Sequence, residues 1–132
     1  MQTLASIDIG LKRIGCAISV GLDIVTPQDA ILRKNRNQAS KDTDKFLKQW
    51  NITTLVVGSP ASNEEMQRRI KHFVSLLEFD GKIVFVNEDM SSIEAENSMK
   101  GVIKYKRDGR IDSLAAKIIL ERYIIANNKA NS

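Results

Sequence analysis

Three acidic residues stand at positions where a carboxylate is unusual in a folded chain. Asp8 lies inside the apolar run 3–9, where a buried charge is costly unless a cation or hydrogen-bond donors replace its lost hydration. Glu88 comes just past the apolar run 82–86, and open sheets bind their ligands beyond the ends of the strands. Asp112 lies near the start of the last helical pattern. These carboxylates are the candidates for a catalytic centre.

The last predicted helix carries Asp112 on the side away from its solvent stripe. Polar residues that recur every four positions predict this stripe, namely Ser113, Lys117 and Glu121. At 3.6 residues per turn, Asp112 points about 140° away from Lys117. The small residues Ala115 and Ala116 lie on the opposite side and would let the helix approach the sheet closely. We therefore expect Asp112 to face the strand that carries Asp8.

Each of the three acids also has a purely structural interpretation. Asp8 can turn the chain before Gly10. Glu88 can be an acidic residue stabilised by the dipole of the following helix, and Asp112 can be the N-cap of the last helix. Position alone leaves both kinds of interpretation open.

Convergent carboxylates repel one another unless a hard cation lies between them. With one cysteine, Cys16, and one histidine, His72, the chain cannot supply a Cys/His zinc cage. Mg²⁺ and Mn²⁺ bind oxygen ligands and share their coordination shell with phosphate oxygens. Two such ions about 3.5–4 Å apart activate the attacking water and stabilise the leaving oxygen in phosphodiester hydrolysis. The sequence therefore predicts a nuclease that uses Mg²⁺ or Mn²⁺, with two ions.

Basic residues are concentrated just before the last predicted helix. The formal net charge is +4, and segment 100–110 contains five lysines and arginines against one acid. Such a segment attracts a nucleic-acid backbone, although a lysine-rich loop is often only solvated. The residues expected to bind nucleic acid are Lys12, Arg13, Lys104, Lys106, Arg107 and Arg110.

The apolar runs and turn residues predict an α/β fold. Runs 3–9, 14–20 and 24–33 are joined by short glycine-containing segments, which predicts antiparallel hairpins. The polar segment 35–43 leads into a helix that ends near Trp50, and the strand that follows is expected to be parallel. The remaining expected elements are a strand at 52–58, a helix that starts with a Ser62/Glu65 capping box and extends to Leu77, a strand at 82–86, a helix at 91–103 and a helix at 110–127.

Together these elements predict a mixed five-stranded sheet, three strands antiparallel and the rest parallel, with helices on both faces. The length of 132 residues predicts one domain over 1–132, with a disordered polar tail at about 127–132. No apolar run reaches the roughly 18 residues of a membrane span, and no signal peptide is evident, so we expect a cytoplasmic protein. Cys16 should pack in the core and His72 should be solvated, whereas monomer and homodimer both remain open.

Four motifs resemble the YqgF (RuvX) family, and the resemblance covers nearly the whole chain. They are segment 8–17, Val57-Gly58-Ser59-Pro60, Glu88 with Ser91 and Glu94-Ala95-Glu96, and segment 106–116. The resemblance implies a ribonuclease-H-like fold, dependence on Mg²⁺ or Mn²⁺, and a bacterial role in maturing the 5′ end of 16S ribosomal RNA. An older assignment of the family is Holliday-junction resolution. By matching motifs, the family's acidic triad corresponds to Asp8, Glu88 and Asp112.

The chain departs from the family pattern in two places. Asn87-Glu88-Asp89 stands where the family more often has Asp-Glu-Arg, and segment 59–63 is shorter than the corresponding loop. Two other functions compete with a nuclease. One is non-catalytic binding to ribosomal RNA or an assembling ribosome. The other is an actin-like or sugar-kinase phosphate loop, suggested by Asp8-Ile9-Gly10, although the chain is short for such a two-domain ATPase.

Overall fold

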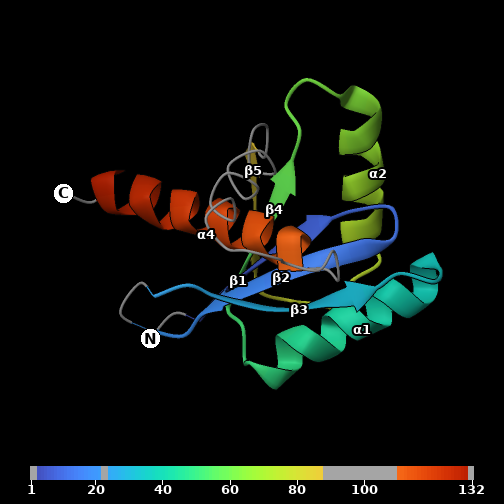
Figure 1. Ribbon diagram of the computed structural model, residues 1–132, viewed down its shortest axis with the longest axis horizontal. Helices are drawn as coiled ribbons and strands as arrows, with labels where there is room; N and C mark the ends of the chain where they lie inside the picture. Colours follow the sequence, from blue (N-terminus) through green and yellow to red (C-terminus); the bar gives the residue numbers. More distant parts are fainter. Residues whose placement is uncertain (1–2, 22–23, 88–109, 131–132) are drawn as a thin grey trace, which may run out of the picture.

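The computed structural model describes residues 3–21, 24–87 and 110–130, with the side chains at 110–112 and 128–130 outside the description. Its strands form a five-stranded sheet in the order β3-β2-β1-β4-β5 (Figure 1). β1 pairs antiparallel with β2 and β2 with β3, whereas β1, β4 and β5 run parallel. The predicted mixed sheet is confirmed. The strands are β1 (Leu4–Ile9), β2 (Arg13–Ser19), β3 (Thr26–Leu32), β4 (Thr54–Ser59) and β5 (Lys82–Asn87).

Helices cover both faces of the sheet, as predicted (Figure 1). Successive side chains of a strand point to opposite faces. In β1, Ile7 and Ile9 pack into a core with α1 (Arg36–Gln49) and α2 (Glu64–Ser75). Leu4 packs into a second core with α4 (Arg110–Ala130) on the other face. We call these the α1/α2 face and the α4 face.

The turn between β1 and β2 is closed by a backbone hydrogen bond from Gly10 N to Arg13 O at 2.9 Å. A Cβ atom on Gly10 would lie 2.7 Å from the Arg13 carbonyl oxygen, so a side chain does not fit there. The register of the hairpin pairs Asp8 with Gly15 and Ile9 with Ile14. Glycine at this turn therefore fixes the position of Asp8 relative to the strand opposite.

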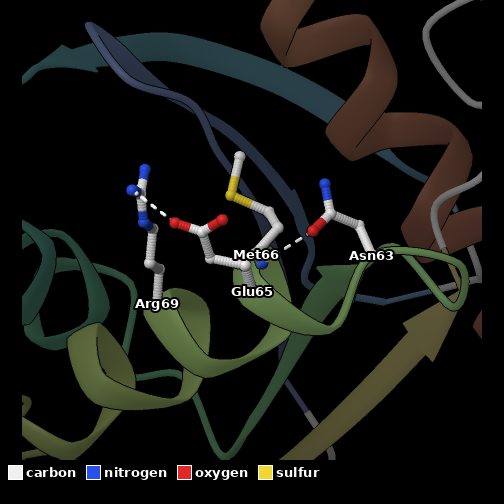
Figure 2. A network of polar contacts seen from close by, with 4 residues as sticks. All are labelled: Asn63, Glu65, Met66 and Arg69. Carbon is white, nitrogen blue, oxygen red and sulfur yellow. Dashed lines mark hydrogen bonds and ion pairs between the residues drawn. The ribbon is translucent and has the colours of Figure 1, made fainter.

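The starts of the first two helices differ from the sequence prediction. Segment 35–43 belongs largely to α1, because Asn35 forms a capping box with Gln38 and the helix begins at Arg36. In α2 the N-cap is Asn63, whose Oδ1 accepts from Met66 N at 3.0 Å (Figure 2). The predicted Ser62/Glu65 capping box was thus one residue early, since serine and asparagine are comparable N-caps. The end of α2 at Ser75 is two residues before the predicted one.

The solvent stripe predicted for the last helix is wrong at Ser113. This residue is buried, and its Oγ donates to the Gln28 carbonyl of β3 and accepts from Cys16 N at 3.5 Å. A hydroxyl can be buried when the sheet satisfies it, which polarity patterns do not reveal. The prediction of a solvent-facing residue is correct at Glu121, which is exposed. α4 runs to Ala130, beyond the predicted end at 127, and so includes most of the tail expected to be disordered.

The helix predicted at 91–103 and the basic segment before α4 lie outside the described residues. Among the helices that are described, none is long and apolar enough to span a membrane.

Candidate active site

The parallel strands β1, β4 and β5 end at one edge of the sheet, which we call the carboxyl edge. The register pairs Ile7 with Val57 and Ser59 with Asn87 across these strands. At this edge the Asn87 Oδ1 accepts from Ala61 N at 3.4 Å and connects the end of β5 to the loop after β4. Glu88 is the next residue along the chain and lies outside the described residues. β5 therefore ends beside β4 at this edge, and the site predicted at Glu88 stays a prediction.

Asp8 lies one residue before the end of β1, on the α4 face. It is half-buried, and the residue opposite it in β2 is Gly15, which has no side chain. Its carboxylate makes no hydrogen bond or ion pair with another described residue, so the interpretation as a turn-forming aspartate has no contact to support it here. The half-buried carboxylate is thus placed at the carboxyl edge, on the face of the sheet that α4 covers.

α4 approaches β1 closely on this face. Ser6, two residues before Asp8 on the same side of β1, donates its hydroxyl to the Ala116 carbonyl of α4. Ala115 and Ala116 are both buried, which confirms that small residues let this helix approach. Asp112 is the third residue of α4 and precedes Ala116 by one helical turn, while its side chain lies outside the description.

The predicted three-carboxylate centre is only partly within the described residues. The described residues contain no group of three His, Cys, Asp or Glu side chains that could hold a metal ion. Glu88 and the Asp112 side chain are not among these described residues. Of the predicted nucleic-acid ligands, Lys12 is exposed and Arg13 is half-buried on the β1–β2 hairpin. The remaining ones, Lys104, Lys106, Arg107 and the Arg110 side chain, fall outside the description.

Two residues set aside by the sequence analysis behave as expected. Cys16 is fully buried in the core, and this burial raises the pKa of its thiol to about 12. The thiol therefore stays protonated at neutral pH and cannot serve as a thiolate nucleophile. His72 is exposed on α2, and its Nε2 lies 3.1 Å from Arg36 Nη1. Sequence reasoning missed the arginines near this histidine, because they come from separate elements.

The family model RuvX, described as Holliday junction resolvase, matches residues 2–126. This chain belongs to the RuvX family. A relative from Sulfurovum sp. (strain NBC37-1) is 58% identical over 124 residues, which cover 92% of this chain and 97% of that protein. A relative from Campylobacter lari is 48% identical over 126 residues, which cover 93% of this chain and 97% of that protein. Both carry the name "Putative pre-16S rRNA nuclease".

Solved structures confirm the ribonuclease-H-like fold expected of a RuvX family member. RuvC of T. thermophilus, in complex with a Holliday junction substrate, superposes with a TM-score of 0.58 at 12% identity, and the match covers 96% of each chain. The fowlpox virus Holliday junction resolvase superposes with a TM-score of 0.60 at 12% identity and covers 96% of this chain and 99% of that one. RuvX family members are nucleases that hydrolyse phosphodiester bonds, so the predicted enzyme class is confirmed.

Proposed function

We propose that this RuvX family member is a metal-dependent nuclease that processes the 5′ end of precursor 16S ribosomal RNA in the cytoplasm. Two relatives that carry the name "Putative pre-16S rRNA nuclease" support this substrate. Their alignments cover at least 92% of this chain at 48–58% identity. The observation that carries the proposed site is Asp8, a half-buried carboxylate without a described partner at the carboxyl edge, next to the closely packed α4.

In this proposal Asp8, Glu88 and Asp112 hold Mg²⁺ or Mn²⁺, as two ions. Asp8 fits such an ion because it is a half-buried carboxylate that no described residue neutralises, and an uncompensated charge there is costly. β5 ends with Asn87 at the same edge as Asp8, and Glu88 is the next residue in the sequence. Asp112 lies one turn before the point at which α4 meets Ser6. When bound, the ions would supply an activated water and stabilise the leaving oxygen.

The protein's own cations would hold the substrate around this centre. Lys12 is exposed at the β1–β2 turn, four residues after Asp8, and Arg13 begins β2 beside it. Their charges would bind phosphates that flank the cut, and those of Lys104, Lys106, Arg107 and Arg110 would do so from the chain that leads into α4. These side chains would orient the phosphate backbone, which a hydrolytic site of this kind requires of the protein.

Nuclease assays on two substrates test the proposal. The purified protein should cut a precursor 16S RNA fragment in Mn²⁺ or Mg²⁺ and should lose this activity in excess chelator. Full cleavage in the chelator would contradict the metal site. Tight RNA binding without cleavage in any metal would instead identify a non-catalytic RNA-binding module.

Resolution of four-way DNA junctions is the second candidate function. The description of the matching family model favours it, as do the junction-resolving enzymes that share the fold. Phosphate contacts do not distinguish RNA from DNA, so the two substrates must be compared directly. A preference for the four-way junction over the RNA, at equal concentration and metal, would replace the first candidate with the second. Membership of the RuvX family gives no support to the ATP-binding alternative.

A further inference from the structure

A pocket of about 380 Å³ lies on the α1/α2 face. Its lining residues come from the β1–β2 turn, the end of β3, the start of α1 and α2, elements that can be followed in Figure 1. We call it the arginine pocket, because four arginines line it: Arg33, Arg36, Arg68 and Arg69. They come from three parts of the chain, and no carboxylate is among the described residues that line it. Four guanidinium groups around one cavity create a site for an anion.

Two of these arginines contact partners that carry no negative charge. Arg33 donates from Nη1 to the Gly10 carbonyl at 2.9 Å, and its guanidinium lies 5.6 Å from the centre of the Phe73 ring. Arg36 Nη1 lies 3.1 Å from His72 Nε2, which must accept because arginine has no acceptor. Neither partner carries a negative charge, so the positive charge of these guanidinium groups is not cancelled.

The other two arginines lie on the exposed surface of α2. Arg69 forms an ion pair with Glu65 at 2.8 Å, and the two side chains are 62% and 67% exposed (Figure 2). An exposed pair of this kind contributes only about 0–1 kcal/mol. An incoming phosphate can therefore displace Glu65, since guanidinium groups bind phosphate in a bidentate manner. Arg68 is exposed beside it.

Apart from the arginines and His72, the lining of the pocket is apolar. Ile9, Met66 and Ile70 contribute to its lining, together with Leu11, which is 70% exposed at the β1–β2 turn. Leucine at that exposure gains little from the fold and offers its surface to a ligand. An apolar wall next to guanidinium groups suits a nucleotide, because the base takes the apolar surface and the phosphate takes the cations. The volume lies within the range of pockets that hold small ligands.

The pocket adjoins the proposed active site through the hairpin itself. Ile9, Gly10 and Leu11 line the pocket, and Asp8 precedes them directly on the opposite face of β1. A strand of nucleic acid that reaches Asp8 can therefore continue over the β1–β2 turn. We propose that the arginine pocket binds one nucleotide of the single-stranded RNA beside the cut phosphate, an inference that rests on the proposed function.

The test measures RNA affinity without turnover, in excess chelator, by fluorescence anisotropy. The triple variant Arg36→Gln/Arg68→Gln/Arg69→Gln removes three charges and spares Arg33, which holds the turn. Its affinity for a single-stranded precursor fragment should fall about tenfold or more, because charged hydrogen bonds to phosphate are lost. The slope of log affinity against log salt should fall by about 0.7 if one phosphate contact is lost.

A matched control removes three charges from the same face outside the pocket. The variant Lys41→Gln/Lys45→Gln/Lys48→Gln changes exposed residues of α1 and should bind RNA within about twofold of the unaltered protein. Leu11→Ser removes the apolar wall without changing charge. It should weaken RNA binding about fivefold and leave the salt slope unchanged. Circular dichroism melting curves of all variants should match the unaltered protein, since these side chains are exposed.

Several outcomes would overturn the proposal. They are an arginine variant that binds as the unaltered protein does, a lysine control that loses as much affinity, and an unaltered protein that binds no single-stranded RNA. A free nucleoside monophosphate tests the other source of the same chemistry. Binding of adenosine monophosphate that depends on the arginines and does not compete with RNA would assign the pocket to a free nucleotide and overturn the strand assignment.

The proposed function can fail separately from the pocket. If the arginine variant loses RNA affinity but the unaltered protein cuts nothing in Mn²⁺, the nuclease proposal fails and the pocket stands. If the unaltered protein cuts RNA and the arginine variant binds and cuts equally well, the pocket fails and the nuclease proposal stands. Across a series of RNA concentrations, the arginine variant should show a raised KM, and its cleavage rate at saturating RNA, which reports kcat, should be unchanged.

Discussion

Both faces of the sheet bury aliphatic residues and alanines, but they differ in the large aromatic Phe73 buried on the α1/α2 face and in the partners of their buried hydroxyls. On the α1/α2 face the buried hydroxyl of Thr43 donates to the Ala39 carbonyl within its own helix, at 2.8 Å. On the α4 face, Ser6 and Ser113 donate to carbonyls of a different element. One face therefore contributes chiefly burial energy. The other fixes the position of a helix relative to the strand that carries Asp8.

The largest effect should come from Phe73, which is buried in the core of the α1/α2 face. Phe73→Ala should destabilise the protein by about 3–5 kcal/mol, because it removes a large buried side chain and leaves a cavity. Urea denaturation measures this loss. The control Phe85→Ala changes a residue that is 42% exposed and should cost much less. Equal losses in the two variants would mean that burying Phe73 adds no more stability than a partly exposed aromatic side chain does.

Asp8→Asn should separate activity from stability on the α4 face. The substitution keeps the size of the side chain and removes the proposed metal ligand. Cleavage of precursor RNA should fall by roughly a hundredfold or more, since even outer-shell partners of metal ligands cost 10–100-fold. The melting temperature should stay the same or rise, because a half-buried charge is removed. A variant that retains full activity at saturating Mn²⁺ would remove Asp8 from the site.

Ala116→Leu should lower both the stability of the protein and its cleavage activity by a moderate amount. Ala116 is fully buried and its carbonyl accepts the Ser6 hydroxyl, so a larger side chain must displace α4 from the sheet. We expect a loss of about 1–3 kcal/mol from overpacking. Cleavage measured per folded molecule should fall as well, because α4 carries Asp112. The control is Ala126→Leu at an exposed position of the same helix, where both stability and cleavage should be retained.

The sequence predicted the sheet well because the signals that order its strands are local. Short glycine turns produce hairpins, and a helix between two strands produces a parallel crossover. The sequence prediction was wrong where two neighbouring residues suit one role, as Ser62 and Asn63 do for the N-cap of α2. It failed also at Ser113, because its hydroxyl meets a strand that is 85 residues away in sequence.

Of the candidate site, the position of Asp8 was predictable because an acid inside an apolar strand stands out. The arginine pocket could not be predicted from the sequence. Its four arginines come together only because α1 and α2 pack against the β1–β2 turn. A weak signal was present in the sequence. Leu11 interrupts a turn between Gly10 and Lys12, where a polar residue is usual.

The β1–β2 turn is held by one residue in two ways. Arg33 donates its backbone N–H to the Lys12 carbonyl at 2.8 Å and its guanidinium to the Gly10 carbonyl at 2.9 Å. The spacing between the β1–β2 turn that lines the pocket and Asp8 is consequently set by hydrogen bonds to backbone carbonyls of the turn. If a nucleotide binds in the pocket, the hairpin would fix its distance from the active site. The cut bond would then lie a constant number of nucleotides from the bound one, whatever the base sequence.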